Sequence, residues 1–187
     1  MIPNRMNPLG SPPYLRRLAY LGATGTQYID TGYTPGADFT AEITLSGTVS
    51  AGGRQGWQSN EFRFTSHPTS IDVMFANGGE TVSGDFSYLR TVEFGTDGKF
   101  YVDGSLISER TGTLTSFFSF YLFQFNNGGS SAAGGGTGRI TRAVLKSSGV
   151  KVRDMIPVLD KSGVPCMFDA VTEKLFYNAG TGTFNYA

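Results

Sequence analysis

The sequence predicts an all-β protein whose strands form an antiparallel sandwich of two sheets. Apolar residues recur at every second position in many short segments, which is the period of a strand with one buried face. The 187 residues include 26 glycines, 15 phenylalanines and 9 tyrosines, a composition typical of strands joined by tight turns. No segment has the 3.6-residue period of a long amphipathic helix, which disfavours an α/β fold or a helical solenoid.

The first thirteen residues differ from the rest of the chain. They contain four prolines, which remove backbone donors and favour extended conformations in their neighbours. We expect residues 1–13 to form an extended arm before one domain, residues 14–187. The apolar side chains of Ile2, Met6 and Leu9 predict that this arm docks on another chain, in a homo-oligomer or on a different protein.

The clearest strand pattern lies in residues 38–46, where the side chains of Phe39, Ala41, Ile43 and Leu45 share one face. Threonine and glutamate occupy the positions between them, so the other face is polar. The same reasoning predicts strands in residues 61–66, 70–76, 91–95 and 99–107, and an aromatic strand in residues 116–125.

Turn signals divide the remaining sequence into hairpins. Asp97-Gly98 favours a tight turn because glycine accepts a positive φ at little cost. Ser148-Gly149 predicts a second turn in the middle of residues 138–160. Residues 173–186 complete the pattern with the last predicted strands.

Residues 153–176 contain polar residues with a predicted structural role. Arg153 and Asp154 are interpreted as a pair that anchors a strand end to a neighbouring loop, and Pro157 is expected to stop further pairing on that edge. Phe168-Asp169 and residues 172–176 predict a hairpin. A structural role is favoured over a catalytic one for these aspartates.

Two similar segments lie near the two ends of the chain, TGTQY at 24–28 and TGTFN at 181–185. In a sandwich with Greek-key or jelly-roll winding the first and last strands often lie side by side. We therefore expect the two segments to meet at the same end of the sandwich. The alternative is that Thr-Gly-Thr is simply a common turn composition.

Charge and residue counts exclude several classes of function. Fifteen lysines and arginines balance fifteen aspartates and glutamates and are scattered, so a nucleic-acid binder is not expected. Cys166 is the single cysteine and His67 the single histidine, so we predict no disulfide, metal site or cofactor. No window approaches the roughly 18 apolar residues of a membrane span, so no membrane insertion is expected.

The sequences YLRRLAYLGATGTQYIDTGYTP, at 14–35, and GRITRAVLKSSGVKVRDMIPVLDKSGVPCMFDAVTEKLFYNAGTGTF, at 138–184, carry a resemblance. They resemble the concanavalin A-like, laminin G-like jelly-roll domains of bacteriophage structural proteins and bacterial surface proteins. The central part of the chain resembles these domains in its strand pattern alone. The resemblance implies a two-sheet jelly roll with a role in binding or virion architecture, and it identifies no ligand.

The carboxylates do not have the spacing of a retaining glycosidase. Such jelly-roll enzymes resemble one another in a Glu-x-Asp-x-(x)-Glu strand, whose carboxylates must sit about 5 Å apart. Each glutamate of this chain stands alone in the sequence, and His67 has no evident serine or cysteine partner. We predict no catalytic residues and no enzymatic activity.

One glycine-rich loop has the chemistry of a ligand site. Arg54, Trp57, Gln58 and Asn60 would provide an aromatic face and planar donors for a sugar, with His67 expected close behind. The alternative for Trp57 is a place in the core between the sheets.

These features predict a non-enzymatic bacteriophage virion protein that displays a lectin-like jelly roll, is tethered by its N-terminal arm and attaches to host-surface glycans. The expected partners are other virion proteins and further copies of the chain. The alternative is a bacterial carbohydrate-binding or adhesin module, located outside the cell or on its surface.

Overall fold

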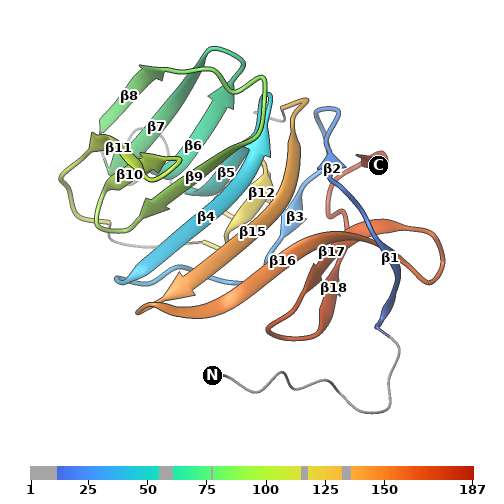
Figure 1. Ribbon diagram of the computed structural model, residues 1–187. Coiled ribbons are helices and arrows are strands. Elements are labelled where there is room, and N and C mark those ends of the chain that lie inside the picture. The colour runs from blue at the N-terminus through green and yellow to red at the C-terminus, as the bar shows by residue number, and fades with distance from the viewer. Residues whose placement is uncertain (1–11, 55–60, 77, 115–117, 132–135) are drawn as a thin grey trace.

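The chain folds into two β-sheets packed face to face, as the computed structural model in Figure 1 shows. The structure describes residues 12–54, 61–76, 78–114, 118–131 and 136–187. These residues contain strands, turns and bends but no helix. The prediction of an all-β protein with two sheets is therefore confirmed. The predicted arm falls largely on residues 1–11, including Ile2, Met6 and Leu9, which lie outside the described residues.

The first sheet contains the longest strands and pairs antiparallel throughout. Its central strand is β4 (Phe39–Ser46), which pairs with β9 on one side and β15 on the other. The strand order is β11 (Ser105–Glu109), β10 (Lys99–Val102), β9 (Arg90–Gly95), β4, β15 (Arg139–Ser147), β16 (Val150–Asp160), β17 (Pro165–Asp169) and β18 (Lys174–Phe176). Three short strands extend it: β1 (Tyr14–Arg17) pairs with β16, and β2 (Leu21–Gly22) pairs with β15 and with β19 (Asn185–Tyr186).

The second sheet covers the inner face of the first. Its order is β14 (Ser130–Ser131), β13 (Phe125–Asn127), β5 (Ser50–Arg54), β6 (Glu61–His67), β7 (Ser70–Ala76) and β8 (Gly78–Ser83). A further strand, β12 (Tyr121–Phe123), pairs with β5 and with β3 (Ile29–Asp30).

The single aromatic strand predicted in residues 116–125 is wrong. Phe123 has a φ of 71°, which reverses the chain there and separates β12 from β13. As a result β12 runs antiparallel to β5, whereas β13 runs parallel to it. This parallel pair is an exception to the antiparallel pairing that the sequence predicts.

The core lies between the sheets and follows the predicted alternation. In β4 the four apolar side chains are fully buried and the residues between them are partly exposed. Phenylalanines of both sheets meet in the centre: the ring of Phe94 lies 5.0 Å from that of Phe62 and 5.2 Å from that of Phe64. Aromatic pairs at this separation add to the stabilisation that burial alone provides.

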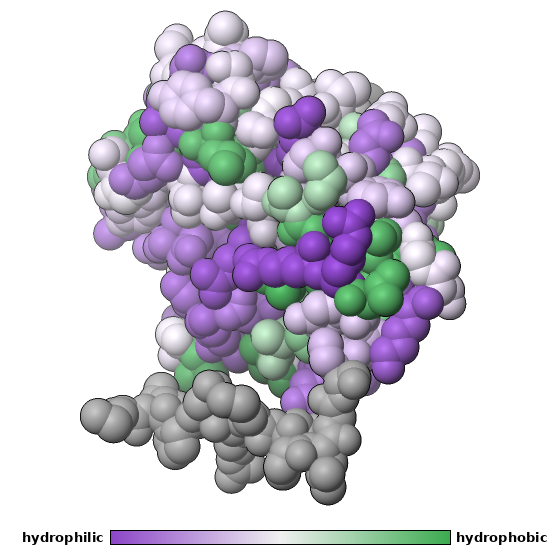
Figure 2. Space-filling view, turned by 45° about the vertical axis from the view of Figure 1, so that its right-hand side comes forward, coloured by the Kyte–Doolittle hydropathy of each residue, from purple (hydrophilic) through white to green (hydrophobic). Residues whose placement is uncertain are grey.

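The outer face of the first sheet is polar. Lys146 Nζ lies 3.4 Å from Glu42 Oε2, and Asp154 accepts hydrogen bonds from Arg142 at 2.9 Å and from Lys151 at 2.7 Å. Figure 2 shows hydrophilic residues gathered across the middle of the molecule, with apolar residues beside them at a few places.

The predicted hairpin turns at Asp97-Gly98 and Ser148-Gly149 are confirmed. Ser148 and Gly149 have φ values of 47° and 76°, which suit the two-residue turn between β15 and β16. The strand predicted over residues 99–107 is divided by a further turn at Asp103-Gly104, where φ is 49° and 78°. This turn separates β10 from β11.

The two similar segments meet, as the sequence predicts. Thr26 Oγ1 donates to the carbonyl of Thr181 at 2.9 Å, and Gln27 Nε2 donates to the carbonyl of Thr183 at 3.2 Å. The strand β19, which follows the second segment, pairs with β2, which precedes the first. Both ends of the domain are therefore fixed to each other.

The expectations for residues 153–157 are met in part: Arg153 anchors β16 to the segment after β3, but Asp154 is not its partner. Arg153 and Asp154 do not pair, because alternate side chains of β16 point to opposite faces: Arg153 Nε donates to the carbonyl of Thr31, and Asp154 pairs with Arg142. On one side of β16 the pairing with β17 continues past Pro157 to Leu159, whereas on the other side the pairing with β15 ends at Met155 and β1 pairs with Val158–Asp160. The carbonyl of Pro157 accepts the N–H of Leu18, just beyond β1, so the missing N–H of proline costs the sheet little.

The predicted hairpin of residues 168–176 is confirmed and is organised by one buried carboxylate. Asp169 is fully buried, and its oxygens accept hydrogen bonds from the N–H of Asp154 at 2.7 Å and from Thr172 Oγ1 at 2.6 Å. It also accepts the N–H of Val171 at 3.1 Å and lies 3.7 Å from Arg153 Nε. Asp169 thus stabilises the turn between β17 and β18, and does so without access to solvent.

Replacing Asp169 with alanine is expected to lower the free energy of unfolding by about 3 kcal/mol, because three donors and a cation lose a buried partner. Urea unfolding followed by tryptophan fluorescence measures this change. The matched control is Glu109→Ala, since Glu109 is 57% exposed and lies 4.0 Å from Lys99. That variant should lose less than about 0.5 kcal/mol. Equal stability of the two variants would contradict the role given to Asp169.

Candidate functional site

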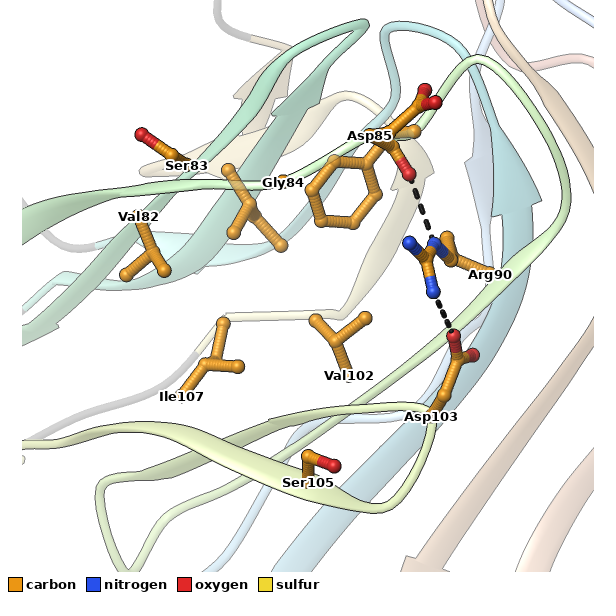
Figure 3. A pocket seen from close by; sticks show the side chains of 11 residues that line it. Val82, Ser83, Gly84, Asp85, Arg90, Val102, Asp103, Ser105 and Ile107 are labelled. Carbon is orange, nitrogen blue, oxygen red and sulfur yellow. Dashed lines mark hydrogen bonds and ion pairs between the residues drawn. The ribbon is translucent and has the colours of Figure 1, made fainter.

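A pocket of about 280 Å³ opens at one end of the sandwich, where the edges of the two sheets separate (Figure 3). We call it the end pocket. Strands β7 and β8 and the segment after them form one wall, and the start of β9 with the β10–β11 hairpin forms the other. Its apolar lining consists of Ile71, Val82, Phe86, Val102 and Ile107. Its polar lining comprises Ser83, Asp85, Arg90, Asp103 and Ser105.

Arg90 is the central polar residue of the end pocket. Its Nε donates to the carbonyl of Asp85 at 2.9 Å, and its Nη1 donates to Asp103 Oδ2 at 2.6 Å. The guanidinium carbon lies 4.3 Å from the centroid of the Tyr88 ring. The third nitrogen, Nη2, points into the space between Val82, Val102 and Ile107 (Figure 3). Among the described residues Nη2 has no hydrogen-bond acceptor.

Asp103, in the β10–β11 hairpin of the same wall, holds the guanidinium. Its Oδ1 accepts the N–H of Thr91 at 2.8 Å, so both carboxylate oxygens are engaged. The bond from Thr91 is the largest cause that lowers the pKa of Asp103; burial opposes it, and Arg90 lowers the pKa further. The carboxylate therefore stays ionised at neutral pH and keeps its charge beside Arg90.

Exposed apolar side chains are next to lining residues of the end pocket in the sequence. Tyr88 and Leu89, in the segment before β9, are 49% and 54% exposed, and Leu106 in β11 is 52% exposed. The ring of Tyr88 is held against Arg90 and is open to solvent on the rest of its surface. An aromatic ring in this setting can stack on a ligand with an apolar face.

A shallower depression of about 400 Å³ shares Gly84 and Asp85 with the end pocket and adds Pro68, Thr69 and Ser87. The Asp85 carboxylate points away from the end pocket in Figure 3 and accepts hydrogen bonds from both the N–H and the hydroxyl of Ser87. The concave surface therefore continues across the segment that joins β8 to β9.

Beside the end pocket, an ion pair and hydrogen bonds join strand β8 of the second sheet to the end of strand β11 of the first. Arg110 Nη2 lies 3.0 Å from Glu80 Oε2 and donates to the carbonyl of Gly79 at 2.9 Å. Ser108 donates to the same carboxylate at 2.8 Å. These contacts tie β11 to β8, so the two walls of the pocket are fixed relative to each other.

The described residues contain no cluster of three or more histidines, cysteines, aspartates or glutamates that could hold a metal ion. Cys166 is fully buried, and burial raises the pKa of its thiol to about 12, which makes it a poor nucleophile. They also include no helix long and apolar enough to cross a membrane.

The sequence-predicted ligand site stays a prediction, because the structure describes only part of it. Trp57, Gln58 and Asn60 lie outside the described residues, and Arg54 ends β5 opposite Glu61. His67 lies at the far end of β6, where its Nε2 is 3.1 Å from Asp72 Oδ2. Six residues of strand, about 20 Å, separate it from the start of β6. His67 and Glu61, which pairs with Arg54, therefore lie at opposite ends of β6.

The residues of the end pocket were missed because no single motif contains them. Arg90 and Asp103 are thirteen residues apart and come from different strand ends. The one available signal was the Asp103-Gly104 pair, which is as strong a turn signal as Asp97-Gly98. That signal would have placed Asp103 at a turn, although it would not have identified Arg90 as its partner.

Comparison of the sequence with protein-family models gave no match, and comparison with curated proteins gave none either. The function is therefore argued from the geometry of the site and from the sequence resemblance.

The thiol of Cys166 is expected to resist modification in the folded protein. With a pKa of about 12, on the order of one thiol in ten thousand is ionised at pH 8, and the fully buried sulfur cannot meet the reagent. Reaction with an aromatic disulfide reagent, followed by absorbance, measures this. The same protein in concentrated urea is the control and should react within minutes. Equally fast reaction of the folded protein would contradict the buried position.

Proposed function

We propose that the protein is a non-enzymatic, lectin-like β-sandwich of a bacteriophage particle that binds host-surface glycans at the end pocket. The observation that carries the proposal is the Arg90 guanidinium, whose Nη2 has no acceptor among the described residues and faces a small apolar pocket beside the exposed ring of Tyr88. An aromatic face, planar hydrogen-bond donors and an apolar floor are the groups that recognise a sugar ring.

The size of the end pocket suits a small ligand group. At about 280 Å³ it is at the lower end of the volumes found for ligand pockets, so it accepts one ring or one substituent. The adjoining depression over Gly84 and Asp85 gives room for a second ring. An oligosaccharide end could thus occupy both, with Tyr88 beside it.

The polar groups of the end pocket suit binding better than hydrolysis. Both oxygens of Asp103 accept strong hydrogen bonds, and its lowered pKa makes it a poor proton donor at neutral pH. The Asp85 carboxylate points elsewhere, so among the described lining residues no second carboxylate faces Asp103 across the pocket. A ligand would therefore be held without being cleaved.

The virion setting rests on the resemblance of residues 14–35 and 138–184 to domains of bacteriophage structural proteins. The jelly-roll winding, the tethering arm and the homo-oligomer belong to the same proposal. The alternative, a bacterial adhesin or carbohydrate-binding module, uses the same pocket and differs in having no particle to join.

Glycan binding tests the role of the pocket. The full chain is expected to bind bacterial surface glycans on an array, and Tyr88→Ala should weaken binding at least tenfold because the stacking face is lost. Tyr186→Ala is the matched control, since Tyr186 is also exposed, at 41%, but lies on β19. It should bind like the wild type. Absence of any glycan binding, or undiminished binding by Tyr88→Ala, would refute the proposed site.

Deletion of residues 1–13 tests the virion setting. The shortened protein is expected to unfold at the temperature of the full chain but to be absent from purified particles, because its tether is gone. Incorporation is measured by immunoblotting of particles, with the full chain as control. Undiminished incorporation would show that the arm is not the tether, and absence of the full chain from particles would favour the adhesin alternative.

A further inference from the structure

We propose that the end pocket selects sugars that carry an N-acetyl group, with the acetamido substituent inserted into the pocket and the sugar ring lying against Tyr88. This inference rests on the proposed glycan binding and names the class of glycan. It starts from the mismatch between an apolar pocket and a hydroxyl-rich ligand.

The interior of the end pocket offers few partners to a hydroxyl. Val82, Val102 and Ile107 surround the space that Arg90 Nη2 faces, and Phe86 and Ile71 complete the apolar lining. A sugar hydroxyl inserted there would leave part of its hydrogen-bonding capacity unmet, which disfavours binding. A methyl group loses nothing in such a place and gains from leaving water.

The position of Arg90 favours a ligand that has a hydrogen-bond acceptor next to the methyl group. Its Nε and Nη1 are already bonded to Asp85 and Asp103, whereas Nη2 faces the pocket with its N–H groups free among the described residues. A carbonyl oxygen two bonds from a methyl carbon, as in an acetamido group, meets both requirements at once. A hydroxymethyl or a plain hydroxyl meets only one of them.

Charge favours a neutral acceptor over a carboxylate. The Arg90 cation is already paired with Asp103 at 2.6 Å, and the lowered pKa of Asp103 keeps that partner negative. A carboxylated sugar would bring a second negative charge towards Asp103, and like charges at short distance repel. An amide carbonyl accepts from Nη2 without this cost.

The mouth of the pocket suits the remaining groups of such a sugar. Ser105 follows the tight turn of the β10–β11 hairpin and lines the pocket, so its hydroxyl oxygen is an acceptor for the amide N–H. Tyr88 is held by Arg90, so its ring is positioned before the ligand arrives. Recognition of the N-acetyl group and stacking of the ring thus depend on the same guanidinium.

Titration calorimetry of the full chain tests the inference with N-acetylglucosamine and N-acetylgalactosamine, each paired with its parent hexose. We expect at least tenfold tighter binding of the acetylated sugar in one pair or both. Arg90→Lys keeps the charge but removes the planar fork, and should bring the ratio of affinities close to one. Arg142→Lys is the control on the outer face of the first sheet and should keep the wild-type ratio.

A second variant, Val102→Thr, tests the inference independently in case Arg90→Lys does not fold. Val102→Thr keeps the shape of the side chain and places a hydroxyl against the inserted methyl group. It should reduce the preference for the acetylated sugar several-fold, and cooperative thermal unfolding should show that the variant is folded. Equal binding of acetylated and parent sugars, or tighter binding of glucuronic acid, would overturn the inference and leave the glycan-binding proposal standing. Failure to bind any of these sugars or any arrayed glycan would overturn both.

Discussion

The contact of Phe94 with the phenylalanines of the opposite sheet is the interaction on which the rest of the structure depends. Phe94 belongs to β9, and Phe62 and Phe64, its neighbours at 5.0 and 5.2 Å, belong to β6. The contact joins the two sheets and also fixes the register of β9. A shift of one residue would turn Phe94 and Val92 to solvent, so the core strongly resists it.

The same register builds the end pocket. Arg90 lies on the inward-facing side of β9, four residues before Phe94, and Val102 lies two residues after the buried Phe100 of β10. Both positions continue the core beyond the point where the sheets pack closely. The pocket is thus the open end of the core. Arg90 shares the inward face of β9 with the apolar side chains that fill the core further along the strand.

The sequence alone could predict which residues face the core but not which strands become neighbours. Alternation in β4 identified its buried face, and dipeptides with glycine identified two turns, because both depend on local geometry. The pairing of Arg90 with Asp103 depends on a turn within a segment that the alternation predicts as strand, and the reversal at Phe123 depends on a positive φ that no sequence signal indicates. The inward position of Ile107 is even harder to predict from the sequence, since Ile107 is the extra residue of a β-bulge. Phe100 pairs with Ser108 and Tyr101 pairs with Leu106, which leaves Ile107 without a partner in the register. A bulge re-aims a side chain without any mark in the hydrophobic pattern.

Three contacts hold the guanidinium of Arg90 before any ligand arrives, and they come from both walls of the pocket. The Asp85 carbonyl and the Tyr88 ring belong to the segment after β8, whereas Asp103 belongs to the β10–β11 hairpin. A donor fixed in this way loses little conformational freedom on binding, so more of its hydrogen-bond energy remains as affinity. Its position also depends on the separation of the two walls, which the Glu80–Arg110 pair and the phenylalanine core maintain. The proposed recognition at the end pocket is therefore coupled to the packing of the sheets, because a change that lets the walls move apart removes the donor from the place where a ligand would meet it.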